Sequence, residues 1–222
     1  MKIIIYGNGA MARVVYSYIR HNMEVCGFTV DDSCINQNNF CELPLIPFSK
    51  VEYQFSPKIY KMLIAVGFVD MNELRNIKYQ EAKHKGYQFV SYVHDSVFQH
   101  DDMLIAENCI ILDFVSIHPG TTVGHSTFIS SNTNIGHDCN IDHSNWINSG
   151  VAIAGSCQIG SGCFFGVNSS VGNDINIGNQ NFIAANTFIS KNTKDNEVYL
   201  SEVGQHLKMQ SKRFLKFSSA LK

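Results

Sequence analysis

The sequence predicts two folds in one chain, a small parallel α/β sheet followed by a triangular prism of short parallel β-strands. The first ninety residues alternate short apolar runs with stretches of helical spacing, which is typical of an α/β domain. From residue 105 to residue 189 every sixth residue is Ile, Val or Phe, and an unbroken period of six indicates a repeat architecture. Three six-residue sides make an 18-residue coil, so residues 18 apart are expected to stack about 4.8 Å apart, as paired strands do.

The elements of the first part follow from local patterns. Residues 2–6 predict a strand, and the glycine loop at residues 7–12 leads into a stretch with helical spacing. Residues 24–30 predict a second strand, residues 31–59 contain three prolines and are expected to be irregular, and residues 61–66 predict a third strand. Asp70 and Glu73 predict a capping box for a helix that Gly86 ends, and residues 87–91 predict a fourth strand.

Residues 18 apart form columns on the three outward faces of the predicted prism. One column is aromatic, with Phe128, Trp146, Phe164 and Phe182. A second is polar (Thr122, Asn140, Gln158, Asn176, Lys194), and a third is mostly small (Ser116, Asn134, Ala152, Ser170, Phe188). Because four aromatic side chains would leave a large apolar patch on a monomer, we expect neighbouring subunits or the C-terminal tail to cover that face.

Composition excludes several classes of function. The chain of 222 residues has a net charge of −2, which gives no reason to expect nucleic-acid binding. The N-terminal apolar run is too short for a signal peptide or a membrane span, so we expect a cytoplasmic protein without a membrane partner. Four of the seven cysteines share one inward position of the repeat and no pair has a CxxC spacing, so no metal site is expected.

Residues 195–222 form a tail rich in Lys and Arg. Its apolar residues Leu207, Phe214, Leu215 and Phe217 suggest that part of it packs against the body. For its charges we favour a solvated helix face over a phosphate-binding role.

The column positions bring one histidine beside a backbone amide. Gly155 lies 18 residues after His137 and is therefore expected one strand spacing above it. A general base beside a free backbone N–H is the pair that acyl transfer requires, since the base takes a proton and the N–H stabilises the developing oxyanion. Asp138 follows His137 and is placed to orient its imidazole.

The string from Ile135 to Ile141, which contains His137 and Asp138, resembles the active-site coil of bacterial hexapeptide sugar acetyltransferases. Within them the chain is most similar to the family with an N-terminal nucleotide-sugar-binding domain, which includes nucleotide-linked amino-sugar N-acetyltransferases and sialic acid O-acetyltransferases. The resemblance covers the glycine loop, the acidic pair after the second strand, and the hexapeptides.

The resemblance implies a Rossmann-like nucleotide-sugar-binding domain at residues 1–92, a left-handed parallel β-helix at residues 93–194 and a C-terminal tail at residues 195–222. It implies a homotrimer with active sites between subunits, acetyl-CoA as the donor and direct attack on its thioester. The substrate it implies is a nucleotide-linked amino sugar used in surface-polysaccharide, including lipopolysaccharide, biosynthesis.

The resemblance also assigns residues. It implies that His137 is the catalytic base and Asp138 its acidic neighbour, and that the Gly155 N–H contacts the acetyl carbonyl. The acetyl-CoA site so implied also includes Trp146, Gly166 and Asn173. The nucleotide sugar is assigned to a set in the first domain: Gly7, Asn8, Gly9, Ala10, Met11, Asp31 and Asp32.

Two features depart from the family. Trp146 occupies the place of a second histidine that some relatives have nine residues after the first. The Gly-x-Pro-Ala-Lys segment near the end of many relatives is absent, and Gln210 to Lys216 stand there instead.

Other functions remain open at this stage. The glycine loop fits Gly-x-Gly-x-x-Ala, a weak signal for NAD, but no second domain for hydride transfer follows it. A γ-type carbonic anhydrase uses the same kind of prism with three zinc-binding histidines, whereas this prism lacks the His-x-x-x-x-His pair of that family. A non-catalytic trimeric binding module is a third possibility. Transfer to a sugar hydroxyl instead of an amine requires the same base, so N- and O-acetylation are not distinguished.

Overall fold

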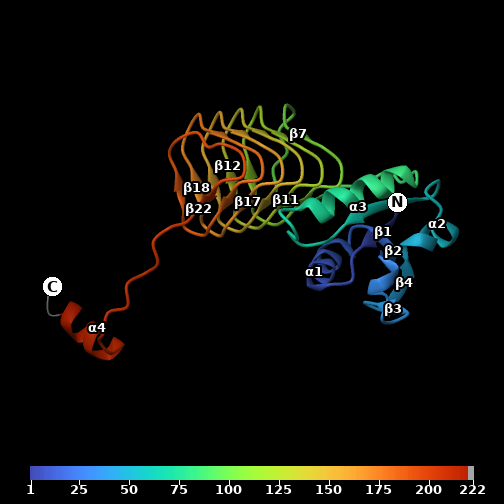
Figure 1. Cartoon of the computed structure of the whole chain (residues 1–222), viewed down its shortest axis with the longest axis horizontal. Coiled ribbons are helices and arrows are strands. Elements are labelled where there is room, and N and C mark those ends of the chain that lie inside the picture. The colour runs from blue at the N-terminus through green and yellow to red at the C-terminus, as the bar shows by residue number, and fades with distance from the viewer. Residues whose placement is uncertain (220–222) are drawn as a thin grey trace.

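The computed structural model describes residues 1–219, with side chains up to residue 217. Three parts follow one another along the long axis in Figure 1: an α/β domain, a prism of stacked coils, and an extended tail that ends in a helix. The α/β domain packs against one end and one face of the prism.

The N-terminal sheet has five strands in the order β3-β4-β2-β1-β5. They are β1 (Lys2–Tyr6), β2 (Glu24–Val30), β3 (Asn39–Phe40), β4 (Leu43–Pro47) and β5 (Tyr60–Ile64). All neighbours are parallel except β3 and β4, which form an antiparallel pair. The first two predicted strands are confirmed with the predicted bounds, and the third is confirmed with shifted ends.

Two expectations for this domain are wrong. Residues 31–59 contain β3, β4, two 3₁₀ helices (Asp32–Cys34 and Phe48–Lys50) and α2 (Val51–Gln54). Prolines are tolerated in β4 because it lies beside the short edge strand β3 and its two prolines are at or near the strand ends. The predicted fourth strand reduces to one bridge between Met62 and Phe89, and Tyr92 and Val93 join the prism instead.

Two longer helices pack on the sheet, α1 (Ala10–Ile19) and α3 (Glu73–His84). Gly86 follows α3 with φ of 85°, as predicted for a terminating glycine. The predicted capping box is wrong, because Asn72 precedes the helix in the left-handed region and no side chain caps it. Asp70 contributes its backbone carbonyl to the Glu73 N–H at 2.9 Å, not its carboxylate.

The prism consists of three parallel sheets of two-residue strands. The polar face contains β7 (Leu104–Ile105), β10 (Thr122–Val123), β13 (Asn140–Ile141), β16 (Gln158–Ile159) and β19 (Asn176–Ile177). The small face contains β9 (Ser116–Ile117), β12 (Asn134–Ile135), β15 (Ala152–Ile153), β18 (Ser170–Val171) and β21 (Phe188–Ile189). The aromatic face contains β6 (Tyr92–Val93), β8 (Ile110–Ile111), β11 (Phe128–Ile129), β14 (Trp146–Ile147), β17 (Phe164–Phe165), β20 (Phe182–Ile183) and β22 (Val198–Tyr199).

The register of the prism follows the period of the sequence. Phe128 pairs with Trp146 and Trp146 with Phe164, so the predicted columns of residues 18 apart are confirmed. The repeated Ile, Val and Phe side chains fill the interior, and the four repeat cysteines are also buried there. The Sγ of Cys139 lies 3.2 Å from the Ala154 carbonyl, to which the thiol donates.

The aromatic face is covered by the chain's own α/β domain. Phe68 lies 5.6 Å from Trp146 and 4.4 Å from Phe164 between ring centroids, and the Arg75 guanidinium lies 4.9 Å from the Trp146 ring. One apolar core joins Phe128, Trp146 and Phe164 to strands and helices of the domain. The expectation that other subunits or the tail cover this face is therefore wrong.

The tail leaves the prism after β22. Residues 200–210 lead to α4 (Ser211–Ser219), which lies apart from the prism in Figure 1. Leu207, Phe214 and Phe217 are exposed, so the expectation that they pack against the body is wrong. Within residues 1–219, no helix is long and apolar enough to cross a membrane.

Candidate active site

The central feature of the prism surface is the corner at which each coil passes from the small face to the polar face. We call it the His137 corner; it comprises residues 118–121, 136–139, 154–157 and 172–175. His137 Nδ1 lies 2.8 Å from Asp138 Oδ2. Because a carboxylate only accepts, it holds the proton on Nδ1 and leaves the Nε2 lone pair free to accept another. Both side chains are more than half exposed, so substrates can reach them.

Gly155 lies directly above this imidazole. A Cβ atom on Gly155 would be 2.5 Å from His137 Nε2, so only glycine leaves room for the ring. The Gly155 carbonyl accepts from the Asp174 N–H at 3.0 Å, whereas within residues 1–219 the Gly155 N–H has no acceptor. A free N–H beside a basic nitrogen is the arrangement that the column positions predicted.

The Asp138 carboxylate has its own supporting glycine. Asp138 takes φ of 55°, and its N–H donates to the Pro119 carbonyl at 3.0 Å. Gly120 lies below it with φ of 74°, and a Cβ there would collide with Asp138 Oδ1. Gly120 thus makes room for the carboxylate that orients His137.

Asn173 completes the His137 corner. With its amide oriented to donate, its nitrogen lies 3.0 Å from the Gly155 carbonyl. This contact and the one from Asp174 fix the peptide that follows Gly155. The structure therefore brings together four predicted residues, His137, Asp138, Gly155 and Asn173.

Two residues predicted for acetyl-CoA lie elsewhere in the chain. Trp146 is on the aromatic face, under the α/β domain. Gly166 lies at the corner between the aromatic and small faces, packed against the backbone of Ala184 and Ala185. Neither shares the His137 corner.

A second candidate region is a cavity of about 620 Å³ around the glycine loop. It is lined by Gly7, Asn8, Gly9, Ala10 and Met11, with Asp31 at the end of β2. Because α1 begins at Ala10, its free backbone N–H groups open into this cavity, as is typical of diphosphate sites. Gly7 has φ of 136° and a Cβ there would lie 2.6 Å from the Ala65 carbonyl, so only glycine allows this turn.

The two predicted acidic residues differ in position. Asp31 lines the cavity and forms an ion pair with Lys78 at 2.7 Å. Asp32 accepts from the Ser49 N–H at 3.2 Å and the Ser49 hydroxyl at 2.6 Å, which lowers the pKa of its carboxyl. Asp31 is therefore the acid next to the cavity, while Asp32 closes the turn after β2.

The far wall of the glycine-loop cavity was not predicted from the sequence. It is formed by Gly67, Phe68, Val69 and Leu74 after β5, together with Trp146 from the prism. Their position after a parallel strand was a usable signal, because ligands bind at the carboxyl ends of such strands. The domain contact that adds Trp146 had no sequence signal.

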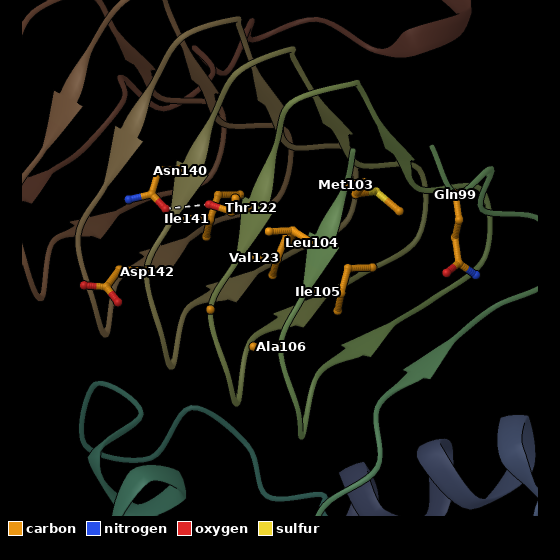
Figure 2. A pocket seen from close by; sticks show the side chains of 11 residues that line it. Gln99, Met103, Leu104, Ile105, Ala106, Thr122, Val123, Asn140, Ile141 and Asp142 are labelled. Atoms are coloured by element: carbon orange, nitrogen blue, oxygen red, sulfur yellow. Dashed lines mark hydrogen bonds between the residues drawn. The ribbon is translucent and has the colours of Figure 1, made fainter. Parts of the chain in front are cut away.

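A third depression of about 530 Å³ lies on the polar face (Figure 2). Leu104, Thr122 and Asn140 line it from three successive coils, and Thr122 donates to Asn140 Oδ1 at 2.6 Å. Figure 2 shows Gln99 at one end and Asp142 at the other.

The remaining histidines do not form a metal site. Tyr79, His125 and His143 stack in that order, with ring centroids 4.4 and 4.8 Å apart, between α3 and the prism. Burial, and then the nearby His143, lower the pKa of His125. No group of three metal-binding side chains occurs within residues 1–219.

Comparisons with known proteins agree with this architecture. Residues 2–82 match the family model described as the PglD N-terminal domain. PerB from Caulobacter crescentus, solved with CoA and GDP-perosamine, is 20% identical with a TM-score of 0.81, covering 89% of this chain and 93% of that chain. The acetyltransferase domain of PglB from Neisseria gonorrhoeae FA1090, solved with acetyl coenzyme A, is 18% identical with a TM-score of 0.79, covering 89% and 94%.

WeeI from Acinetobacter baumannii AYE is also similar, at 15% identity and a TM-score of 0.66, covering 89% of this chain and 96% of that chain. No curated protein sequence matches the chain. The predicted fold class, an α/β domain followed by a left-handed parallel β-helix, is confirmed by these likenesses, as is the resemblance to hexapeptide acetyltransferases with such an N-terminal domain.

Proposed function

We propose that this chain, whose residues 2–82 match the PglD N-terminal domain, transfers an acetyl group from acetyl-CoA to the amino group of a nucleotide-linked sugar. The observation that carries the proposal is the His137–Asp138 pair at 2.8 Å beneath the unpaired N–H of Gly155. PerB and PglB, which share the fold, were solved with CoA or acetyl-CoA, and PerB also with GDP-perosamine.

In the proposed reaction, His137 Nε2 accepts a proton from the sugar amine as the amine nitrogen bonds to the acetyl carbon. The Gly155 N–H donates to the carbonyl oxygen while that oxygen carries negative charge. The carbon–sulfur bond then breaks, and His137 returns the proton to the departing sulfur. Asp138 keeps the imidazole in one tautomer and stabilises it while it is charged.

We assign the glycine-loop cavity to the nucleotide. The backbone of Gly7, Gly9 and Ala10 would hold the diphosphate at the start of α1, where the helix dipole favours negative charge. Asp31, Phe68 and Trp146 line the same cavity. We therefore reassign Trp146 from acetyl-CoA to the nucleotide sugar.

We further propose a homotrimer whose active sites lie between subunits. The glycine-loop cavity borders the aromatic face, whereas His137 lies at the corner between the other two faces. A nucleotide sugar bound in the cavity therefore faces away from the His137 of its own chain. In such an assembly we assign acetyl-CoA to the interface between subunits. The depression on the polar face and the corner at Gly166 are its candidate contacts there.

The subunit arrangement has a direct test in mixed assemblies. His137→Gln removes the base, and Gly9→Asp places a carboxylate where the diphosphate is assigned. Each variant alone should be inactive, and co-expression of the two should restore part of the activity in particles of three times the chain mass. Absence of restored activity in confirmed mixed particles would contradict shared sites.

The function itself is tested by incubating the chain with acetyl-CoA and a panel of UDP-, dTDP- and GDP-linked amino sugars, with product mass as the readout. We expect a gain of one acetyl group that resists hydroxylamine, since amides resist it and esters are cleaved. A hydroxylamine-sensitive product would indicate O-acetylation. No acetylated product with any member of the panel would count against the proposal.

A further inference from the structure

The charges of the chain are divided unevenly along its length. All 19 acidic residues lie before residue 203, while five of the 17 basic residues lie after it. The tail therefore carries a net positive charge, whereas the rest of the chain has more acidic than basic residues. A charge block of this kind is typical of a segment that meets a negatively charged partner.

The cations and the apolar residues of α4 lie on opposite sides of the helix. On a helix of 3.6 residues per turn, Lys212, Arg213 and Lys216 span an arc of about 100°. Phe214, Leu215 and Phe217 occupy the opposite side, over an arc of about 160°. The helix thus has one basic side and one apolar side although it is only nine residues long.

The apolar side of α4 faces solvent. Phe214 is 47% and Phe217 59% exposed. Residues 200–210 connect α4 to β22 and place it well outside the prism in Figure 1. The helix therefore presents its aromatic and basic sides away from both folded domains.

We propose that α4 binds the surface of a lipid bilayer that contains anionic headgroups. Lys and Arg beside Phe and Leu are the composition of helices that lie in the membrane interface, where cations meet lipid phosphates and rings enter the acyl boundary. An acidic protein surface alone would pair with Lys212 and Arg213 but leave Phe214 and Phe217 in water. This proposal replaces the expectations of a solvated tail and of no membrane partner.

One nine-residue helix gives weak binding by itself. In the proposed trimer, three copies of α4 would reach one surface together, which raises the apparent affinity. The proposal does not depend on acetyl transfer, since the tail is separate from both candidate sites.

The test is co-sedimentation of the full chain with vesicles of phosphatidylcholine alone or with one quarter phosphatidylglycerol. We expect binding to the anionic vesicles only, and its loss at high salt, because surface charges are screened. Lys212→Gln, Arg213→Gln and Lys216→Gln together should weaken binding by roughly fivefold per cation, or about 100-fold. Phe214→Ser with Phe217→Ser should abolish it at low salt.

A matched control removes the same charge elsewhere. Arg20→Gln, Lys50→Gln and Lys58→Gln lie in the α/β domain and should leave vesicle binding unchanged. The thermal midpoint of each variant reports whether it folds. The proposal is overturned if the folded chain binds neither vesicle, if it binds both equally, or if the control loses as much as the tail variant. It is also overturned if the tail variants change only the oligomeric mass, which would make a second copy the partner.

Discussion

The imidazole of His137 packs against the backbone of Gly155 so closely that a methyl group on Gly155 would lie 2.5 Å from Nε2 and 2.8 Å from Cε1. The base and the oxyanion donor of the proposed reaction therefore occupy adjacent coils. Their separation is set by strand pairing in the prism, not by a flexible loop.

Gly155→Ala should therefore displace the imidazole and lower kcat by about 10²-fold or more, the low end for loss of a general base. Gly172→Ala is the matched control, because its added carbon would have no neighbour closer than 3.5 Å. We expect the control to retain activity and a similar unfolding midpoint. The measurement is steady-state kinetics on both variants. Equal activity of the two would show that the contact between His137 and Gly155 has no catalytic role.

Gly120→Ala tests the support of Asp138. Gly120 and Gly150 have φ of 74° and 71°, and a Cβ on each would collide with a side-chain oxygen, of Asp138 and Asn168 respectively. Both alanine variants should lose about 1–2 kcal/mol of unfolding free energy, since both force a left-handed alanine. Only Gly120→Ala should also lower kcat. If kcat fell equally in the two variants, lower stability would explain the loss, and the support of Asp138 by Gly120 would have no catalytic role.

Nucleotide binding should change the fluorescence of the chain. Trp146 is the only tryptophan and lines the glycine-loop cavity, so its emission should respond to a ligand bound there. We expect one nucleoside diphosphate of a UDP, dTDP and GDP series to alter the emission in a saturable way. Phe68→Ala removes a ring 5.6 Å from Trp146 and should weaken the affinity. Unchanged emission with all three nucleotides would contradict the assignment of the cavity.

The stacked His125 predicts a pH dependence of stability. Burial lowers the pKa of His125, so the unfolded chain takes up a proton near pH 6.5 while the folded chain does not. Its stabilising contribution is complete above pH 6.5 and declines as the pH falls toward the folded pKa. The other charged groups that act on it are His143, Glu107, Asp142 and Lys83.

His125→Phe keeps a ring between Tyr79 and His143 but removes this titration. The thermal midpoint should fall less between pH 7.5 and pH 5.5 in the variant than in the natural chain. Parallel curves for the two proteins would show that His125 does not contribute to the acid sensitivity.

The prism could be predicted almost completely, because the six-residue period of apolar residues recurs in every coil. The pairing of Phe128 with Trp146 and the position of Gly155 over His137 follow from residue numbers alone. The α/β domain was less predictable. Pro44 and Pro47 concealed β4, since proline is uncommon in strands and tolerated only near edges and ends.

The contact between the two domains could not be predicted, because no local pattern encodes it. Phe68 and Arg75 reach Trp146 through tertiary packing, and this contact decides what covers the aromatic face. The wall of the glycine-loop cavity was missed for the same reason. In a repeat, residues that are neighbours in space are a fixed number of residues apart in the sequence. Residues that meet where one domain packs on another have no fixed separation in the sequence.

The central claim is that His137 removes the proton during acetyl transfer. The most direct measurement is the acetylation rate of His137→Gln at saturating acetyl-CoA and acceptor, beside His84→Gln as a control histidine that is exposed on α3. We expect kcat to fall by about 10²–10⁴-fold in His137→Gln alone, with unchanged nucleotide binding by Trp146 fluorescence. Turnover equal to that of the natural chain in folded His137→Gln would contradict the account.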